Sequence, residues 1–566
     1  MSLSSAPWLA FYGNTPASLA YPDKTMYGFL ADTAKQYPQN IAYVFQGKKT
    51  NYADFLQRIE SAAQGLYHLG IRKGDRVTIC MPNSPQALDC FYGLNRIGAI
   101  PNMIHPLSAA QEIAFYINVS HSKAILTLDQ FYEKVASILP QVAQECTVLV
   151  ANIADELPFP LNLLYPMTKA GKHPLSKTGY RLWADVIRTG TELPAHDGRA
   201  DDCAAILYSG GTTGTTKGIQ LSNRNFNALA LQTIAASGYP SIAGMKMLSV
   251  MPIFHGFGLG IGIHTALIGG ATCILVPQFN IKTYADILRK QKPDFIPGVP
   301  TLFEALLRAE SLKKADLGFL KGIFCGGDSL SSELKKKVDA FLRAHHCPEQ
   351  IREGYGTTEC VTASCLTPKD YAREGSIGVP FPDTFYKIVT PGTTDEVEAM
   401  TEGEICVSGP TVMLGYMDNP VETAQTLKNH ADGKVWLHTG DLGYMDADGF
   451  VYFKQRIKRM IISSGYNIYP SQLENIIDSH EKVLISCVIG IPDDYRGKRL
   501  RAYVVPAPGI EANEALKKEL LDYCAQHIAR YAMPKEIVFR TELPKTLVGK
   551  VAYRMLEEEA AKEAST

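Results

Sequence analysis

The chain has 566 residues, of which 46% are hydrophobic and 20% are charged, which is ordinary for a folded protein with three or four structural units. Its 56 Lys and Arg residues nearly balance its 57 Asp and Glu residues, which argues against a dedicated nucleic-acid binder and against an acidic disordered chain. The 12 cysteines show no C-x-x-C pair or zinc spacing, and no secretory signal opens the chain, so we expect free thiols and a cytoplasmic protein.

Short apolar strands alternate with amphipathic helices from about residue 76, which predicts parallel sheets covered on both faces. The first run has strands at 76–82, 123–128 and 146–151 and helices at 84–98 and 131–139. The second run has strands at 204–209, 246–252, 271–277, 294–299 and 322–327 and helices at 224–237 and 282–291. Ligands usually bind at the carboxyl ends of such strands.

The stretch 247–281 contains no Asp, Glu, Lys or Arg and is long enough to cross a bilayer of about 30 Å. It carries Pro252, His255, His264 and several glycines, and it ends in a strand-like ATCILVP. We therefore predict a buried strand–helix–strand here instead of a membrane span.

The pattern changes twice in the second half of the chain. Turns multiply between about 375 and 455, which predicts a β-rich subdomain. A compact α+β pattern follows, with helices at 470–480 and 515–531 and strands at 483–491, 501–507 and 536–540. The predicted fold is therefore α/β, with a large N-terminal domain (1–455) and a small α+β C-terminal domain (456–566).

Residues 208–218 read YSGGTTGTTKG, directly after a predicted strand. Glycines allow close backbone approach to a phosphate, hydroxyls add donors and Lys217 adds charge, so the loop is a candidate anion site. Gly218 follows the Lys, so this is not a Walker A loop. Taken alone, the pattern also fits a flexible surface turn.

The loop resembles the Y-[ST]-S-G-[ST]-[ST]-G-x-P-K-G signature of the AMP-forming adenylating enzymes, which include acyl-CoA synthetases, luciferases and peptide-synthetase adenylation domains. Gly210 and Thr216 depart from that signature. Four further segments resemble family motifs in the same order: GYGTTE (354–359), WLHTGD (436–441), KQRIKRMIISSGYNIYPSQLE (454–474) and PKTLVGK (544–550). Within this family, the sequences of these segments are most similar to those of bacterial long-chain fatty acyl-CoA synthetases.

The resemblance implies a reaction in two halves. A carboxylate attacks the α-phosphate of ATP, with Mg²⁺ bound, to give acyl-adenylate and pyrophosphate, and the thiol of coenzyme A then displaces AMP. Cations and fixed donors must neutralise the charge that concentrates during the first half.

The resemblance also implies roles for individual residues. Lys550 is the expected catalytic cation, Glu359 the Mg²⁺ ligand, Thr358 a contact to the α-phosphate, and Lys458 the hinge about which a mobile C-terminal domain rotates between the half-reactions. Cofactor-binding residues implied by the motifs are Ser209, Gly211, Thr212, Thr213, Gly214 and Lys217 for the phosphates, Gly327, Asp328, Gly354, Tyr355 and Gly356 around adenine, and Asp441 with Arg456 at the ribose.

MPIFHGFGLG (251–260) resembles the acid-pocket motif of the family. It carries no acidic residue that could pair with an α-amino group, which disfavours an amino-acid substrate and favours a hydrocarbon acid. The expected lining residues are His255, Gly256, Phe257 and Val299, and the glycines at 256, 258, 260 and 262 leave room for a long tail. The alternative is an ordinary close-packed helix.

A fatty acid, ATP and coenzyme A are therefore the expected partners, and no nucleic acid is expected. Two alternatives stay open, an acyl- or aryl-AMP ligase that loads a carrier protein and a non-catalytic ATP-binding protein. The apolar segment 157–167 is expected to pack on its own domain, with peripheral membrane contact at the inner face as the alternative. The sequence does not predict an oligomeric state.

Overall fold

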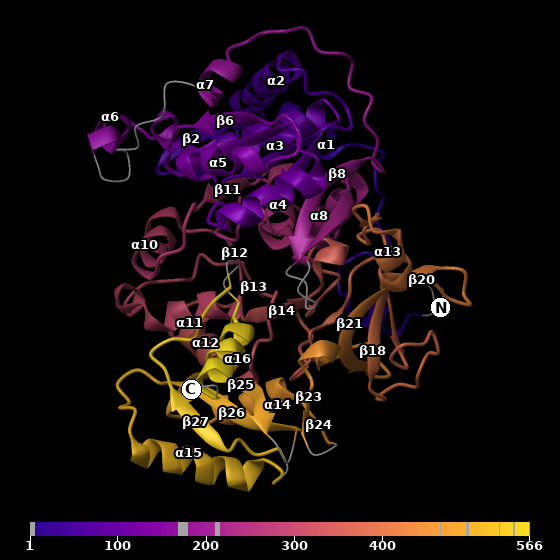
Figure 1. Cartoon of the computed structure of the whole chain (residues 1–566). Helices are drawn as coiled ribbons and strands as arrows, with labels where there is room; N and C mark the ends of the chain where they lie inside the picture. Colours follow the sequence, from indigo (N-terminus) through magenta and orange to yellow (C-terminus); the bar gives the residue numbers. More distant parts are fainter. Residues whose placement is uncertain are drawn as a thin grey trace.

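The computed structural model describes residues 6–167, 179–209, 216–463, 466–493, 497–530, 532–546 and 550–564. In Figure 1 the N-terminal part lies at the top, the β-rich part at the right and the C-terminal part at the bottom. The predicted α/β class, with a large N-terminal part of mainly parallel sheets and a smaller C-terminal part, is confirmed.

The first sheet is parallel over most of its width. Its strand order is β19 (Gly415–Tyr416), β9 (Lys217–Ser222), β8 (Cys203–Ser209), β4 (Ile100–Met103), β3 (Arg76–Cys80), β5 (Ala124–Leu128), β6 (Thr147–Ala151) and β7 (Arg181–Leu182). Strands β8 to β7 run parallel, and β9 and β19 join antiparallel at one edge. The hairpin β8–β9 was not predicted, and it places the phosphate loop at its turn.

The second sheet repeats this plan. Its strand order is β16 (Val379–Pro380), β15 (Cys365–Leu366), β14 (Ile351–Tyr355), β13 (Gly322–Cys325), β12 (Phe295–Gly298), β10 (Lys246–Ser249), β11 (Thr272–Leu275), β1 (Ile41–Phe45) and β2 (Lys48–Asn51). The strands from β14 to β1 are parallel, and the outer pairs are antiparallel. Candidate site residues follow β13 and end β14.

Helices cover the sheets, and they bury apolar side chains mainly in one large core and partly in a second, smaller core. They are α1 (Met26–Gln36), α2 (Tyr52–His68), α3 (Pro85–Arg96), α4 (Ala110–Ser120), α5 (Tyr132–Ile138), α7 (Trp183–Val186), α8 (Asn223–Ala236), α10 (Ile281–Gln291), α11 (Pro300–Arg308), α12 (Ser332–Ala344) and α13 (Pro420–Thr426). Side-chain caps start several of them, for example Ser84 on α3, Ser222 on α8 and Ser331 on α12.

The stretch 247–281 forms the predicted buried strand–helix–strand. Strand β10 leads into a π-helix (Phe257–Thr265) and the short α9 (Ala266–Ile268), and β11 follows. His264 is fully buried and paired on both ring nitrogens, with Tyr92 Oη at 3.0 Å and Asn227 Oδ1 at 2.8 Å. Among the described residues, no helix is both long and apolar enough to cross a membrane.

The β-rich part is an antiparallel sheet with its own core, as predicted. Its strand order is β17 (Phe385–Val389), β18 (Gly403–Ser408), β21 (Val435–Met445) and β20 (Leu427–Asn429), and β22 (Val451–Arg456) also pairs with β21. The hairpin β21–β22 brings two motifs together that lie far from GYGTTE in the sequence.

The C-terminal part has the predicted α+β composition and separate cores. It contains β23 (Ile461–Ser463), β24 (Tyr466–Ile468), α14 (Pro470–Asp478), β25 (Val483–Asp493), β26 (Gly497–Pro506), α15 (Glu514–His527), β27 (Glu536–Phe539) and α16 (Tyr553–Ala564). The β-rich core reaches Phe453 and the next core begins at Ile461, so the expected boundary at 455/456 lies between two cores.

The expectation that the segment 157–167 packs on its own domain is wrong for most of its apolar side chains. Leu157 contacts the main core, but α6 (Leu161–Leu164) and the turn that follows it project from the domain (Figure 1). The exposed side chains are Phe159 (79%), Leu161 (47%), Leu163 (63%), Leu164 (50%) and Met167 (72%).

Candidate active site

Asp441 lies on β21 directly opposite Arg456 on β22, and Tyr355 at the end of β14 reaches it from the large domain. Tyr355 Oη donates a hydrogen bond to Asp441 Oδ2 at 2.7 Å. Arg456 Nε lies 3.3 Å from Asp441 Oδ1. The structure therefore brings together three residues that the sequence placed around adenine and ribose.

The carboxylate of Asp441 is only 2% exposed, and its Oδ1 receives no hydrogen bond from the described residues. Burial raises the pKa of Asp441, and the neighbouring Arg456 guanidinium opposes that rise. A buried carboxylate oxygen that faces a cation but lacks a hydrogen-bond donor is a natural acceptor for a ligand hydroxyl.

Glu359 lies in a single 3-10 turn (Thr358–Cys360) that follows β14. Its Oε1 accepts a hydrogen bond from Tyr416 Oη at 3.0 Å, and the described Lys and Arg residues form no ion pair with it. The turn ends at Val361 with φ +65°, a left-handed conformation that strains a β-branched residue. The carboxylate is held by one hydroxyl and keeps an oxygen for a hard cation.

Close packing fixes the GYGTTE segment around this turn. A methyl group on Gly356 would lie 2.4 Å from the Thr362 carbonyl oxygen, and one on Gly354 would lie 3.2 Å from the Cys365 carbonyl oxygen. Glycine is required at 356 because the backbone of the next turn occupies the space. Thr358 is half-buried beside Glu359.

The structure describes the two ends of the phosphate loop. Ser209 ends β8 and pairs with Lys217 at the start of β9. Gly211, Thr212, Thr213 and Gly214 lie outside the described residues.

Lys217 forms an ion pair with Glu422 of α13, and its ammonium lies 4.9 Å from the centre of the Tyr416 ring. These contacts fit the expected role of steadying the loop. They also link Lys217 to Glu359 through Tyr416.

Lys550 reaches the site from the C-terminal part. Asp328, in the loop after β13, accepts a hydrogen bond from the Val551 amide at 3.3 Å and one from the Ser329 amide at 2.9 Å. Burial lowers the pKa of Lys550, and the Asp328 carboxylate opposes that change most strongly. Asp328, which we expect beside adenine, also holds the backbone next to Lys550 through its carboxylate.

Gly327 marks the point where three regions meet. It has φ +82°, which favours glycine. A methyl group there would lie 3.4 Å from Val299 Cγ1, 3.6 Å from Lys550 Cε and 3.9 Å from Phe257 Cδ1. The expected catalytic lysine and two expected pocket residues therefore surround one backbone position.

His255 precedes the π-helix and accepts a hydrogen bond on Nδ1 from the Phe257 amide at 3.2 Å. Burial, with a smaller contribution from the Lys550 cation, lowers the pKa of His255 to about 3. The imidazole is thus neutral near pH 7. It cannot pair electrostatically with a substrate carboxylate.

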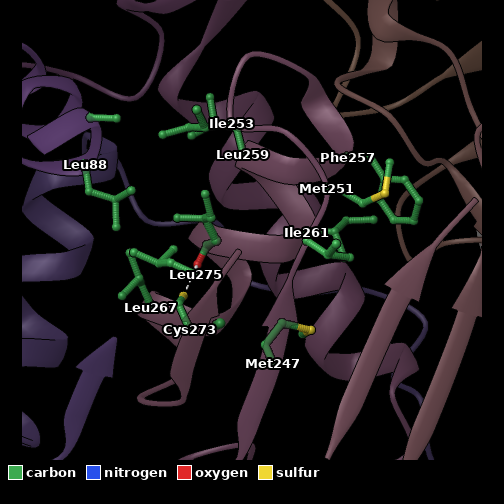
Figure 2. Close-up of a cluster of buried hydrophobic side chains, with 14 of the residues drawn as sticks. Leu88, Met247, Met251, Ile253, Phe257, Leu259, Ile261, Leu267, Cys273 and Leu275 are labelled. Atoms are coloured by element: carbon green, nitrogen blue, oxygen red, sulfur yellow. Dashed lines mark hydrogen bonds between the residues drawn. The ribbon is translucent and has the colours of Figure 1, made fainter. Parts of the chain in front are cut away.

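The idea that glycines leave room for a tail is wrong at three of the four positions. Methyl groups would lie 1.7 Å from the Val361 oxygen at Gly256, 2.0 Å from the Pro252 oxygen at Gly258 and 2.8 Å from Leu229 Cδ2 at Gly260. Only Gly262 tolerates one, with its nearest neighbour at 3.7 Å. Figure 2 shows the consequence, a helix packed tightly among Met251, Ile253, Leu267 and other apolar side chains.

In the segment that joins the two parts, Arg459 makes a side-chain contact to the C-terminal part, whereas Lys458 is exposed. Lys458 is exposed in a single 3-10 turn (Ile457–Arg459) between β22 and β23. Arg459 Nη2 donates to Glu474 Oε1 at 2.5 Å, which fastens the end of the turn to the C-terminal part. Gln455 is buried, and neither of its side-chain polar atoms has a hydrogen-bond partner among the described residues.

Sequence reasoning missed Tyr416, which donates to Glu359 and lies beside Lys217. It belongs to the segment TVMLGY, whose sequence resembles that of the family, so this resemblance could have identified Tyr416. The strained Val361 and the ion-pair partner Glu422 carry no signal in the sequence.

Comparisons with known proteins identify one family over most of the chain. Residues 30–417 match the family model of the AMP-binding enzyme, and residues 472–550 match that of the AMP-binding enzyme C-terminal domain. The long-chain-fatty-acid–CoA ligase of Bacillus subtilis (strain 168) is 36% identical over 573 residues, covering 98% of both chains. The ligase of the same name from Salmonella typhimurium (strain LT2) is 31% identical over 570 residues, again covering 98% of both chains. The crystal structure of ATP-bound MatB from Rhodopseudomonas palustris superimposes with a TM-score of 0.81 at 26% identity, covering 95% of this chain and 99% of MatB.

Proposed function

Because the chain belongs to the AMP-binding enzyme family, we propose that it joins a medium- to long-chain fatty acid to coenzyme A at the expense of ATP. A carboxylate oxygen of the acid bonds to the α-phosphorus of ATP, and pyrophosphate leaves. The coenzyme A sulfur then bonds to the acyl carbon, AMP leaves with the former carboxylate oxygen, and the thiol proton passes to solvent.

The observation that carries this proposal is the meeting of Val299, Phe257 and Lys550 around Gly327. An acid whose tail lies against Val299 and Phe257 presents its carboxylate to the Lys550 ammonium. A cation at that point neutralises the repulsion between the carboxylate and the α-phosphate, which is the main barrier to the first half-reaction.

The nucleotide is supported by the buried Asp441 and its exposed partner Arg456 on the hairpin β21–β22. Asp441 Oδ1 lacks a hydrogen-bond donor, so a ribose hydroxyl satisfies it, while Tyr355 and Arg456 fix the carboxylate in place. MatB from Rhodopseudomonas palustris, whose structure is similar to that of this chain, was solved with ATP bound, which supports a nucleotide as a substrate here.

Glu359 is the residue that we propose to hold Mg²⁺. Its carboxylate is half-buried, oriented by Tyr416 and without an ion-pair partner among the described Lys and Arg residues, which fits a hard cation. A Mg²⁺ ion held by Glu359 would reduce the negative charge of the phosphates that the carboxylate of the acid approaches. Glu359 itself contributes position and one oxygen ligand.

The hydrocarbon character of the acid is supported by the apolar faces of Phe257 and Val299, both buried, and by the neutral state of His255. The relatives from Bacillus and Salmonella are long-chain fatty acid ligases by name. The close-packed π-helix leaves Gly262 as the glycine with free space, so the tail extends past Phe257 and not along the helix face.

We also propose that the chain divides into domains 1–455 and 456–566 that rotate about Lys458. Lys550 must leave after adenylation to let coenzyme A approach the same carbon. Replacing Lys458 by Pro fixes the backbone at this exposed turn and is expected to spare adenylation while blocking thioester formation. Equal losses in both half-reactions would reject the hinge.

The direct test is mass spectrometry of the products from the full chain with ATP, Mg²⁺, coenzyme A and a panel of short-, medium- and long-chain and aryl acids. The proposal predicts acyl-CoA with a maximum at medium or long chains. Acyl-adenylate without acyl-CoA would redirect the acceptor to a carrier protein, and no ATP–pyrophosphate exchange with any acid would leave a non-catalytic ATP-binding protein.

We propose peripheral membrane contact through the exposed apolar side chains of the segment 157–167. The sequence from 157 to 183 contains Lys169, Lys172, Lys177 and Arg181 and no acidic residue, which complements an anionic lipid surface.

Flotation with phosphatidylglycerol and phosphatidylcholine vesicles tests this contact. The variant Phe159→Ser/Leu163→Ser/Met167→Ser is expected to lose binding to the anionic vesicles. The control Met400→Ser/Val421→Ser removes comparably exposed apolar groups elsewhere and is expected to bind like the wild type. Unchanged binding of the triple variant would refute the membrane contact.

A further inference from the structure

Three metal-binding side chains meet in the β-rich part of the molecule, apart from the residues that we assign to ATP and the acid. Cys406 lies on β18, His430 follows β20 and His438 lies on β21, directly opposite Cys406. Their ligand atoms all lie within 4.8 Å of one another, and all three residues are buried. Their spacing in the sequence matches no zinc motif, because antiparallel pairing and a turn bring them together.

The two imidazoles face each other through the atoms that ligate metals. His430 Nε2 and His438 Nε2 are 3.0 Å apart. In a tetrahedral zinc site with Zn–N bonds of about 2.0–2.1 Å, two ligand nitrogens lie about 3.3 Å apart. A separation change of a few tenths of an ångström therefore converts the pair from a hydrogen bond into two zinc ligands.

Glu404 orients His438 in the way that outer partners orient metal ligands. Its Oε2 lies 2.9 Å from His438 Nδ1, and its Oε1 accepts a hydrogen bond from the Gly440 amide at 3.0 Å. A proton on Nδ1 that bonds to a carboxylate leaves the lone pair of Nε2 directed at the cluster. The tautomer that zinc requires is thus selected by the fold.

The ligand types and charges identify the ion. One thiol sulfur and two imidazole nitrogens suit zinc, whereas Mg²⁺ and Ca²⁺ prefer oxygen ligands. Zinc binding displaces the Cys406 thiol proton, and the resulting thiolate together with the Glu404 carboxylate balances the charge of the ion. His430 keeps one proton by moving it to Nδ1, and a water molecule completes four ligands.

We propose that Cys406, His430 and His438 bind one Zn²⁺ ion and that Glu404 positions His438 for it. The ion joins β18, β20 and β21 at the end where β21 presents Asp441, three residues after His438. Glu404 also holds Gly440, the residue before Asp441. The site is therefore structural, and it fastens the strand that carries the buried carboxylate.

The test uses the full chain purified with a tag that lacks histidine, equilibrated with zinc and then desalted. Elemental analysis is expected to give one zinc per chain. X-ray absorption is expected to show one sulfur at about 2.3 Å and two nitrogens at about 2.0–2.1 Å. Less than about a tenth of an equivalent of zinc, or a shell of oxygens alone, would overturn the proposal.

Variants locate the ion. Cys406→Val and His430→Gln are expected to lose the zinc, whereas Cys347→Ser, which alters a buried thiol outside the cluster, is expected to keep it. Glu404→Gln is expected to weaken zinc binding by about 10–100-fold, as for other outer partners of metal ligands. Zinc that persists in both Cys406→Val and His430→Gln would place it elsewhere and refute the site.

If either ligand variant fails to fold, the site can still be tested in the wild-type chain. Replacing zinc by Co²⁺ is expected to give intense visible bands of a tetrahedral ion together with a thiolate-to-cobalt band in the ultraviolet. Weak octahedral bands without the thiolate band would contradict a site that includes Cys406.

Discussion

The nucleotide side and the lysine side of the site are built in opposite ways. Asp441 and Arg456 face each other on adjacent strands, and Tyr355 joins them from a neighbouring sheet, so all three precede the turn that carries Lys458. Lys550 comes from a part of the chain with separate cores, and the backbone beside it is held by a hydrogen bond from the Val551 amide to Asp328.

This difference indicates which half of the site stays assembled and which half can move apart. Asp441 is buried and contacts both Tyr355 and Arg456, so a movement of Asp441 would leave both residues without that partner, and we expect the fold to fix the nucleotide side. The bonds that join the lysine side to the preceding part include Val551 to Asp328 and Lys337 Nζ to the Val483 carbonyl, each worth about 1 kcal/mol. We therefore expect this side to separate at a small cost in hydrogen bonds. The following predictions test that contrast, from the largest expected effect to the smallest.

Replacing Glu359 by Gln removes the charge that we assign to Mg²⁺ and is expected to lower kcat/KM for ATP–pyrophosphate exchange by about 10²–10³-fold. The loss is expected to shrink as Mg²⁺ is raised, because weaker binding is overcome by concentration. Exchange rates across a Mg²⁺ titration measure this. Glu402→Gln, an exposed carboxylate that pairs with Lys454, is the control and is expected to match the wild type. A loss independent of Mg²⁺ would argue against a metal role.

Replacing Asp441 by Asn removes a charged acceptor and leaves Arg456 unpaired. Hydrogen bonds to charged groups are worth about 1.5–3 kcal/mol, so KM for ATP is expected to rise about 10–100-fold. Initial rates at varied ATP give this value. Asp446→Asn changes the same hairpin at its far end, where Asp446 pairs with Arg373, and is expected to leave KM unchanged. Similar KM values for ATP in the two variants would contradict the assignment of Asp441 to the nucleotide side.

Gly256→Ala tests whether packing next to Glu359 is as tight as the structure indicates. Its methyl group would lie 1.7 Å from the Val361 oxygen, so we expect a loss of about 1–3 kcal/mol in the free energy of unfolding. Gly262→Ala meets its nearest neighbour at 3.7 Å and is expected to stay within about 1 kcal/mol of the wild type. Urea unfolding of the two variants compares them, and equal stabilities would contradict the packing.

We expect His255 to lower the free energy of unfolding at acidic pH. Its folded pKa of about 3 lies below the ordinary value of 6.5, so between these values the unfolded chain binds a proton that the folded chain does not. His255 therefore lowers stability as the pH falls from 6.5 towards 3. His255→Gln is expected to flatten the slope of unfolding free energy by about one proton, measured by urea unfolding at pH 5, 6 and 7. An unchanged slope would mean that the imidazole is protonated in the fold.

Much of this arrangement could be predicted from the sequence. Strand–helix alternation indicated the parallel sheets, and turn density indicated the β-rich subdomain, because both depend on local periodicity and composition. The motifs named Asp441, Arg456 and Tyr355, and the structure brings these residues into contact. Their separation in the sequence, 86 residues between Tyr355 and Asp441, hides that contact until the fold is known.

What could not be predicted depends on distant packing. The segment 157–167 has apolar residues typical of a buried turn, yet Phe159, Leu163 and Met167 are exposed. The role of Asp328 depends on where the C-terminal part lies, and the Cys406 cluster depends on strand register. The glycines of the π-helix predicted space, but the neighbouring carbonyl groups of Val361 and Pro252 fill it.

The most direct test of the contrast is to assay the two half-reactions separately in Lys550→Ala, with Lys545→Ala, an exposed lysine on the same segment, as the control. We predict that acid-dependent ATP–pyrophosphate exchange falls by about 10²–10³-fold in Lys550→Ala. Synthetic acyl-adenylate is expected to react with coenzyme A at the wild-type rate, and Lys545→Ala is expected to keep both activities. Equal losses in the two half-reactions, or exchange within about threefold of the wild type, would contradict the account.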